Sequence, residues 1–235
     1  MDRRIILVTG ASRGIGRAAA LMIAKAGNHV IATARSEKAL TRLDDEIRAA
    51  TGSGATLIPL DLRDMAGIDK LASALLERFG RLDGLLGNAG VLGTLGPLEQ
   101  ATPAAFQEAL DVNFTANWRL IRAVHPLLRV SEAGRALFMT SGVVPRPRAY
   151  WGVYAATKAA LETMIACYAD ETEKTPIRVN LYDPGATRTE MRFKAMPGED
   201  QSTLPSPEQV AAKIPFYLSP ACAAHGQRIE FRAIT

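Results

Sequence analysis

The segment IILVTGASRGIG, residues 5–16, combines an apolar strand, a glycine-rich turn and the start of a helix. Ile5–Thr9 is a run of β-branched and apolar residues, typical of a strand that is covered on both faces in a parallel sheet. The turn follows directly, and we expect a helix over 17–26. This order directs backbone N–H groups and the positive end of a helix at one point, where they can bind a pyrophosphate.

The spacing of the glycines leaves two interpretations of this turn open. It is G-x-x-x-G-x-G, whereas the usual dinucleotide fingerprint is G-x-G-x-x-G. One interpretation is a tight structural turn that binds no ligand. The other is a phosphate-binding loop, whose candidate cofactor contacts are Gly10, Ser12, Arg13, Gly14, Ile15 and Gly16.

Strands and helices are predicted to alternate along the whole chain. We expect strands at 5–9, 29–34, 55–60, 82–87, 135–140, 177–181 and 228–231, and helices at 17–26, 37–50, 64–79, 102–128, 152–172 and 206–218. Short connections between them indicate right-handed βαβ units and one doubly wound, parallel sheet of about seven strands with helices on both faces. This α/β fold forms one domain over residues 1–235. Residues 1–90 form mainly the cofactor-binding half and 91–235 the catalytic and substrate half, with an irregular lid at 190–205.

The end of the second strand indicates which nicotinamide cofactor is preferred. In dinucleotide folds this point faces the adenosine ribose, where an acid implies NAD and an arginine can bind a 2′-phosphate. Here Ala34 occupies the place of the acid and Arg35 follows it, while Arg13 supplies a second guanidinium. The pattern predicts NADP over NAD. NAD remains the alternative if Arg35 is only a solvated surface residue.

Two further strand ends carry candidate cofactor contacts. Asp61 and Leu62 follow the third strand, where a carboxylate and an N–H can bind an adenine edge. Asn88, Ala89 and Gly90 follow the fourth strand, and their small size allows the backbone to approach a nucleotide. Both groups are predicted at the same edge of the sheet as the glycine turn.

Tyr154 and Lys158 are the candidate catalytic pair. Four residues apart on a helix predicted over 152–172, they lie on one face. A nearby ammonium favours the phenolate and is expected to lower the tyrosine pKa from about 10. Ser141, at the end of the fifth strand, can share a substrate oxygen with the phenol, and Asn113 in a helix interior suggests a role for its amide or carbonyl. Taken alone, Tyr-x-x-x-Lys is better explained as an ordinary amphipathic helix face, and only the rest of the chain favours the catalytic interpretation.

The composition and charge of the chain argue against several other classes of protein. A hydrophobic fraction of 48% and a charged fraction of 22% are those of a globular protein, and a net charge of +4 without a basic cluster does not suggest nucleic-acid binding. The two cysteines and three histidines have no metal-ligand spacing, and the cysteine usage fits a reducing cytoplasm. The first four residues are too few for a signal peptide, and no run is predicted to span a membrane.

Seven motifs in order resemble the short-chain dehydrogenase/reductase family over essentially the whole chain. They are T-G-A-S-R-G-I-G at 9–16, D-L at 61–62, N-A-G at 88–90, Asn113, Ser141, Y-A-A-T-K at 154–158 and P-G-A-T-R-T at 184–189. Within the family the chain is most similar to bacterial oxidoreductases whose substrate is mostly unassigned. The resemblance implies a Rossmann fold and hydride transfer between a nicotinamide cofactor and a small carbonyl or alcohol substrate.

The resemblance also implies a role for each matched residue. Tyr154 is implied as proton donor in reduction or base in oxidation, and Lys158 as the group that lowers its pKa and binds the nicotinamide ribose. Ser141 is implied to polarise the substrate oxygen, and Asn113 to hold a water in a proton relay. Further contacts to the nicotinamide end of the cofactor are implied for Pro184, Gly185, Thr187 and Thr189.

The chain departs from the family pattern at three places. Gly87 replaces the first of two asparagines, Asp183 puts a charge next to the nicotinamide end, and the ending Ala233-Ile234-Thr235 lacks Asp-Gly-Gly. The last departure leaves the oligomer geometry open. A homodimer or homotetramer through the helices of Asn113 and Tyr154 is what the resemblance implies.

The leading hypothesis is an NADP-dependent ketone or aldehyde reductase. Alternatives are an NAD-dependent alcohol dehydrogenase, a nucleotide-binding regulator without turnover, and a structural scaffold with this fold. The complete set of Asn113, Ser141, Tyr154 and Lys158 favours turnover. Five loop residues would suit an anionic or aromatic substrate if they border the site, but are equally explained as surface residues: Arg146, Arg148, Trp151, Arg192 and Lys194.

Overall fold

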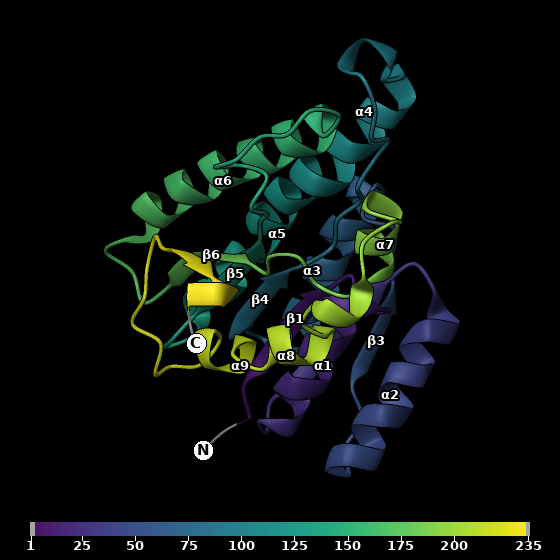
Figure 1. Cartoon of the computed structure of the whole chain (residues 1–235). Coiled ribbons are helices and arrows are strands. Elements are labelled where there is room, and N and C mark those ends of the chain that lie inside the picture. Colours follow the sequence, from purple (N-terminus) through teal and green to yellow (C-terminus); the bar gives the residue numbers. More distant parts are fainter. Residues whose placement is uncertain (1–2, 234–235) are drawn as a thin grey trace.

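The computed structural model describes residues 3–233, which form one sheet of seven parallel strands. The strand order is β3-β2-β1-β4-β5-β6-β7 (Figure 1), and this sheet confirms the predicted doubly wound fold. The strands are β1 (Ile5–Thr9), β2 (His29–Ala34), β3 (Thr56–Pro59), β4 (Gly84–Gly87), β5 (Arg135–Met139), β6 (Arg178–Asp183) and β7 (Arg228–Glu230). The order reverses between β1 and β4, and ligands of such sheets bind beyond the carboxyl ends of the strands at this point.

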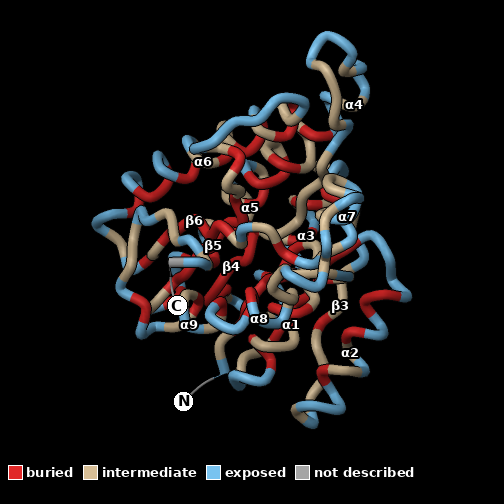
Figure 2. Tube along the Cα trace, in the orientation of Figure 1, coloured by how far each residue is buried: buried red, intermediate tan, exposed pale blue. Residues whose placement is uncertain are grey.

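Helices cover both faces of the sheet (Figure 1). The longer ones are α1 (Gly14–Lys25), α2 (Glu37–Thr51), α3 (Met65–Phe79), α4 (Pro103–Leu110), α5 (Ala116–Val130) and α6 (Gly152–Thr172). One core cluster joins α3, α5 and α6 to the sheet, and the other joins α1, α2 and the C-terminal helices to it. Figure 2 shows the buried residues along the strands and the inner helix faces, while the region around α4 extends outward and is largely exposed.

The predicted helix over 102–128 is wrong in its middle. Between α4 and α5, residues Asp111–Thr115 form one π-helical turn, and α5 continues to Val130. The turn centres on the buried Asn113, whose side chain bonds to Val91 and Thr157 instead of pointing outward. Isolated π-turns of this kind often mark functional sites.

The segment 190–205 is more ordered than predicted. It contains α7 (Glu190–Ala195) and a 3₁₀ turn (Gln201–Thr203) instead of an irregular stretch. The predicted helix over 206–218 is divided into α8 (Pro207–Ala211) and α9 (Ile214–Tyr217). Pro215 explains the break, because its ring would clash with the carbonyl of Ala211 and it has no N–H to donate.

β6 begins one residue later than predicted and ends two residues later. This extension places Asp183 within the sheet, opposite Glu230 of the edge strand β7. Met1, Asp2, Ile234 and Thr235 lie outside the described residues, so the predictions about the two chain ends rest on the sequence alone. In the described part of the chain, no helix combines the length and apolar character needed to cross a bilayer.

Candidate active site

A cavity of about 540 Å³ lies at the carboxyl ends of the strands. It is bordered by the β1–α1 turn, by the segments that follow β2, β3 and β4, and by α6 and the start of α7. The volume falls in the range of small-molecule and cofactor sites. The switch point of the sheet therefore carries a cavity large enough for an extended ligand.

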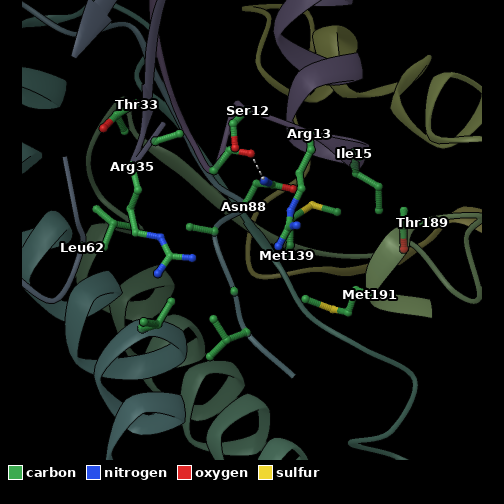
Figure 3. A pocket seen from close by; sticks show the side chains of 18 of the residues that line it. Ser12, Arg13, Ile15, Thr33, Arg35, Leu62, Asn88, Met139, Thr189 and Met191 are labelled. Atoms are coloured by element: carbon green, nitrogen blue, oxygen red, sulfur yellow. Dashed lines mark hydrogen bonds between the residues drawn. The ribbon is translucent and has the colours of Figure 1, made fainter. Parts of the chain in front are cut away.

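The glycine turn is held by close backbone packing on one side of this cavity. A Cβ atom on Gly16 would lie 2.3 Å from the Gly10 carbonyl oxygen, so no larger residue fits without displacement. Gly10 itself has φ of +65°, which favours glycine. The Asn88 side chain donates to the carbonyls of Thr9 (2.9 Å) and Gly10 (3.3 Å), and so fixes the end of β4 against the turn (Figure 3).

The first turn of α1 has free hydrogen-bond donors at the cavity. Ser36 caps α2 and Asp64 caps α3, but the residue before α1, Arg13, makes no side-chain cap. The first N–H groups of a helix need partners, and an anion can supply them. Together with the glycine turn, this uncapped helix end fits the pyrophosphate of a dinucleotide.

Three arginines border the cavity near the end of β2. Arg13 and Arg35 were predicted there, and both side chains reach into the cavity (Figure 3). Arg42 on α2 also lines the cavity and was missed, because nothing in the local sequence marks it as facing the end of β2. Arg13 forms an exposed ion pair with Glu190 of α7. This cluster is a fitting environment for a phosphate dianion.

Asp61 lines the cavity, but its carboxylate already has a strong partner. Arg63 binds it through three hydrogen bonds of 2.6–3.1 Å and, as the main cause, holds its pKa below the usual range. The predicted hydrogen bond from Asp61 to an adenine edge would compete with Arg63. The neighbouring Leu62 also borders the cavity, as predicted.

Tyr154 and Lys158 are both buried and both line the opposite end of the cavity. The Lys158 Nζ donates to the Met139 carbonyl at 2.9 Å and lies 5.9 Å from the centre of the Tyr154 ring. Ser141 follows β5, and the interaction of its hydroxyl with the Tyr154 phenol acts to lower the phenol pKa. The structure therefore brings three of the predicted catalytic side chains together where the cavity reaches α6.

The expected lowering of the tyrosine pKa is wrong for the arrangement in this structure. Burial raises the pKa of Tyr154 to about 12, the Ser141 hydrogen bond opposes this, and the Asp183 charge adds to it. Burial lowers the pKa of Lys158 to about 8, which the Glu162 charge opposes. Burial is the largest cause for both groups, because removal from water disfavours the charged form of each.

The Asn113 side chain is used entirely within the protein. Its oxygen accepts from the Val91 N–H at 2.8 Å, and its Nδ2 donates to the Val91 carbonyl at 2.9 Å and to the Thr157 hydroxyl at 3.0 Å. It thereby fixes the segment after β4 against α6, one residue from Lys158. Both N–H groups of its amide are used, so the predicted relay water would bind to its main chain or to the second lone pair of its side-chain oxygen.

The remaining predicted contacts divide into two groups. Those that line the cavity are Ser12, Gly14, Ile15, Asn88, Ala89, Gly90, Pro184 and Thr189. Gly185, Thr187, Asn113 and Ser141 are outside its lining. The lining also contains residues that sequence reasoning missed, namely Thr33, Ala34, Ser36, Ala39, Arg42, Leu60, Val91, Val112, Met139, Thr140, Glu190 and Met191. No group of His, Cys, Asp or Glu within residues 3–233 is arranged to hold a metal ion.

Comparison with known proteins shows the family. Residues 4–200 match the short chain dehydrogenase model. The uncharacterized oxidoreductase YciK of Escherichia coli K12 is 41% identical over 220 residues, covering 93% of this chain and 86% of its own. A short chain dehydrogenase structure from Shigella flexneri, complexed with NADP, superposes with a TM-score of 0.94 at 37% identity and covers 99% of this chain and 98% of its own.

A second solved structure, from Escherichia coli CFT073 and complexed with NADPH, gives the same TM-score, identity and coverage. The chain belongs to the short-chain dehydrogenase/reductase family and is an oxidoreductase of that family. The glycine turn, the uncapped α1 and the arginine cluster fit the nicotinamide cofactor that the family uses.

Proposed function

We propose that the chain is an NADPH-dependent reductase of ketones or aldehydes. The observation that carries the proposal is the shape of one cavity, which has a basic edge at Arg13, Arg35 and Arg42 and a buried Tyr154–Lys158 pair at its far end. The basic edge suits an adenosine 2′-phosphate, and the buried pair suits proton transfer. The NADP and NADPH complexes of the structural relatives support the same preference.

In the proposed reaction, the bound nicotinamide supplies the hydride. The Tyr154 hydroxyl and the Ser141 hydroxyl bind the substrate oxygen, and Tyr154 gives its proton to that oxygen as it becomes an alcohol. With a pKa of about 12, Tyr154 is protonated at neutral pH and ready to donate. The Lys158 ammonium then stabilises the phenolate.

The cofactor preference is tested by calorimetric titration of the purified protein with NADPH and with NADH. NADPH should bind at least about tenfold more tightly, and Arg35→Ala should remove most of that difference. Lys38→Ala is the matched control, because Lys38 is an exposed cation on α2, three residues after Arg35 and outside the cavity lining. Tighter binding of NADH would reverse the proposal in favour of an NAD-dependent alcohol dehydrogenase.

Turnover is tested with a panel of aldehydes and ketones in the presence of NADPH. Tyr154→Phe should lower kcat by about 10²–10⁴-fold and leave NADPH affinity nearly unchanged. Tyr168→Phe, which removes a buried hydroxyl on the same helix hydrogen-bonded to His125, should keep full activity. NADPH binding without turnover of any carbonyl would favour the regulatory alternative.

The cellular setting follows from the same proposal. A reductase that draws on NADPH for small carbonyl compounds is expected in the cytoplasm and as a homodimer or homotetramer. Light scattering of the purified protein measures the oligomeric state. No macromolecular substrate is part of the proposal.

A further inference from the structure

A buried carboxylate lies directly behind the reaction centre. Asp183 ends β6, and its side chain is only 8% exposed. One oxygen accepts the Gly185 N–H at 2.9 Å. The other lies against the backbone that follows Ser141, since a Cβ on Gly142 would be 3.3 Å from it. A negative charge at this place acts on any charge that develops on Tyr154.

Arg228 on the edge strand β7 neutralises this carboxylate. Its Nη2 donates to the Asp183 Oδ2 at 2.8 Å and to the main-chain carbonyl of Ser141 at 3.2 Å. The guanidinium is also paired with the exposed Glu230. A single arginine thus connects the ends of β5 and β6 at the residue that positions the substrate oxygen.

The same guanidinium reaches the helix of the catalytic pair. Its Nε donates to the Glu162 carboxylate at 3.0 Å, and the Thr140 hydroxyl donates to the same oxygen at 2.5 Å. Glu162 is four residues after Lys158 on α6 and one turn further along its axis. Arg228 therefore joins β5, β6, β7 and α6 through charged or main-chain contacts.

We propose that Arg228 and Asp183 form a positioning pair for the reaction centre, in which Arg228 fixes the main chain at Ser141 and neutralises Asp183 behind the Tyr154 phenol. The inference rests on the proposed function for its catalytic consequence. Neither residue lines the cavity, so both act through Ser141 and Tyr154.

The pair has an electrostatic effect of defined sign. In the described part of the chain, the Asp183 charge acts on Tyr154 and the Glu162 charge acts on Lys158, and Arg228 is ion-paired with both carboxylates. Loss of Arg228 leaves Asp183 unpaired and disfavours the phenolate. Loss of the Asp183 charge favours the phenolate, because the negative charge that acts on Tyr154 is removed while the guanidinium stays paired with Glu162 and Glu230. The two single substitutions should therefore move the phenol titration in opposite directions.

The experiment titrates the phenol by NMR of ¹³C-tyrosine-labelled protein saturated with NADP⁺, with Tyr154→Phe used to assign the signal. Asp183→Asn should lower the Tyr154 midpoint by about one pH unit, and Arg228→Met should raise it by about as much. In the double variant, the Tyr154 midpoint should lie within a few tenths of a pH unit of its value in the unsubstituted protein. Arg178→Met is the control, because Arg178 binds main-chain carbonyls at the opposite end of β6 and should not shift the midpoint.

The contact between Arg228 and the main-chain carbonyl of Ser141 is tested by Arg228→Lys, which keeps the positive charge but lacks the planar guanidinium with its several N–H donors. We expect an unshifted phenol midpoint and a kcat for carbonyl reduction reduced by about tenfold with little change in KM. Shifts of the same sign in Asp183→Asn and Arg228→Met, or an equal shift in Arg178→Met, would overturn the proposal. The NMR titration measures the effect of Asp183 and Arg228 on Tyr154 even if no carbonyl is reduced. Failure of the proposed function can therefore be distinguished from failure of this inference.

Discussion

The two walls of the cavity are built by different forces. The β1–α1 turn is held by contacts between buried backbone atoms, in which Gly16 approaches Gly10 too closely for a side chain. The neighbouring wall, around α7, is held by side-chain ion pairs: Arg13–Glu190, which joins it to the turn, and Lys194–Glu190 are half-exposed or more, and Arg192–Glu199 is partly buried. Exposed pairs of this kind contribute about 0–1 kcal/mol each and weaken with salt.

Because of this difference, the glycine turn is preorganised for a ligand, whereas the α7 wall can adapt to one. The turn can bind a phosphate without rearrangement, since its amides are fixed before a ligand arrives. The α7 wall can move at low cost, because each contact that holds it exchanges readily with water. The rigid wall therefore suits a constant cofactor, and the adaptable wall suits a variable substrate.

Substitution of the buried ammonium should have the largest effect. Lys158→Met is expected to lower kcat by about 10²–10⁴-fold, because the phenolate loses its stabilising charge. In the unsubstituted protein, reduction should decline as the pH rises through about 8, where Lys158 loses its proton. The measurement is the pH profile of kcat, and a profile that stays level well above pH 8 would contradict the role.

The same substitution should stabilise the fold. The Lys158 pKa is lowered from 10.5 to about 8 in the folded state, so between these values the unfolded chain binds more protons and stability rises with pH. Below pH 8 the buried ammonium is a net cost, and Lys158→Met should raise the free energy of unfolding by about 1–2 kcal/mol. Lys194→Met, at a 64% exposed side chain on the α7 wall, should change it little. Denaturant unfolding at pH 7 measures both.

Gly16→Ala should disrupt the packing of α1 against the glycine turn, which forms the rigid wall. The new Cβ would lie 2.3 Å from both the Gly10 carbonyl oxygen and the Asn88 Nδ2, so α1 must shift away from the turn. A displacement of this kind should weaken NADPH binding by about 10²-fold, measured by calorimetry. Gly198→Ala is the control on the other wall, where a Cβ meets nothing within 4 Å, and it should bind NADPH normally. Equal affinities of the two variants would refute the distinction between the walls.

The same contrast explains how much could be predicted from the sequence. The alternation of strands and helices, the glycine turn before α1 and the placement of Tyr154 and Lys158 one turn apart on α6 follow from local patterns and spacing, and the structure confirms them. The π-turn at Asn113 was not predictable, because it depends on bonds to Val91 and Thr157 that are distant in sequence.

Four other outcomes depend on burial or side-chain contacts that sequence spacing does not reveal. The raised Tyr154 pKa results from burial, which spacing on a helix does not reveal. The Arg63 contact to Asp61 and the ordering of α7 depend on side-chain geometry and ion pairs. Asp183 was noted as a departure from the family pattern, but its partner Arg228 lies 45 residues away and only the structure brings them together.

Asn88→Ala should have an intermediate effect on the rigid wall. It removes two hydrogen bonds to the carbonyls of Thr9 and Gly10, and should lower the free energy of unfolding by about 1–3 kcal/mol and weaken NADPH binding by about tenfold. Asn28→Ala removes a similar bond, to the Ile23 carbonyl, just before β2 and so at the end of the strands that lies away from the cavity. It should reduce stability but leave NADPH affinity unchanged. An equal loss of affinity in both variants would mean that Asn88 acts through general stability.

The smallest effect is expected on the adaptable wall, from Glu190→Gln. This change releases Arg13 from its ion pair, so that its guanidinium is free to bind a phosphate. We expect NADPH to bind about two- to threefold more tightly, with a change in the free energy of unfolding below about 1 kcal/mol. Glu199→Gln breaks the Arg192 pair, whose residues do not line the cavity, and should leave the affinity unchanged.

Salt provides the decisive comparison for this last variant. The gain from Glu190→Gln should diminish as the salt concentration rises toward about 1 M, where charges more than about 3 Å apart in solvent are screened. NADH lacks the 2′-phosphate and should show little gain at any salt concentration. A gain that is equal for NADH and NADPH would mean that α7 opens the whole cavity when the pair breaks. A gain confined to NADPH at low salt would mean that Glu190 acts only by occupying Arg13, and that the adaptable wall modulates cofactor selection through a single exposed charge.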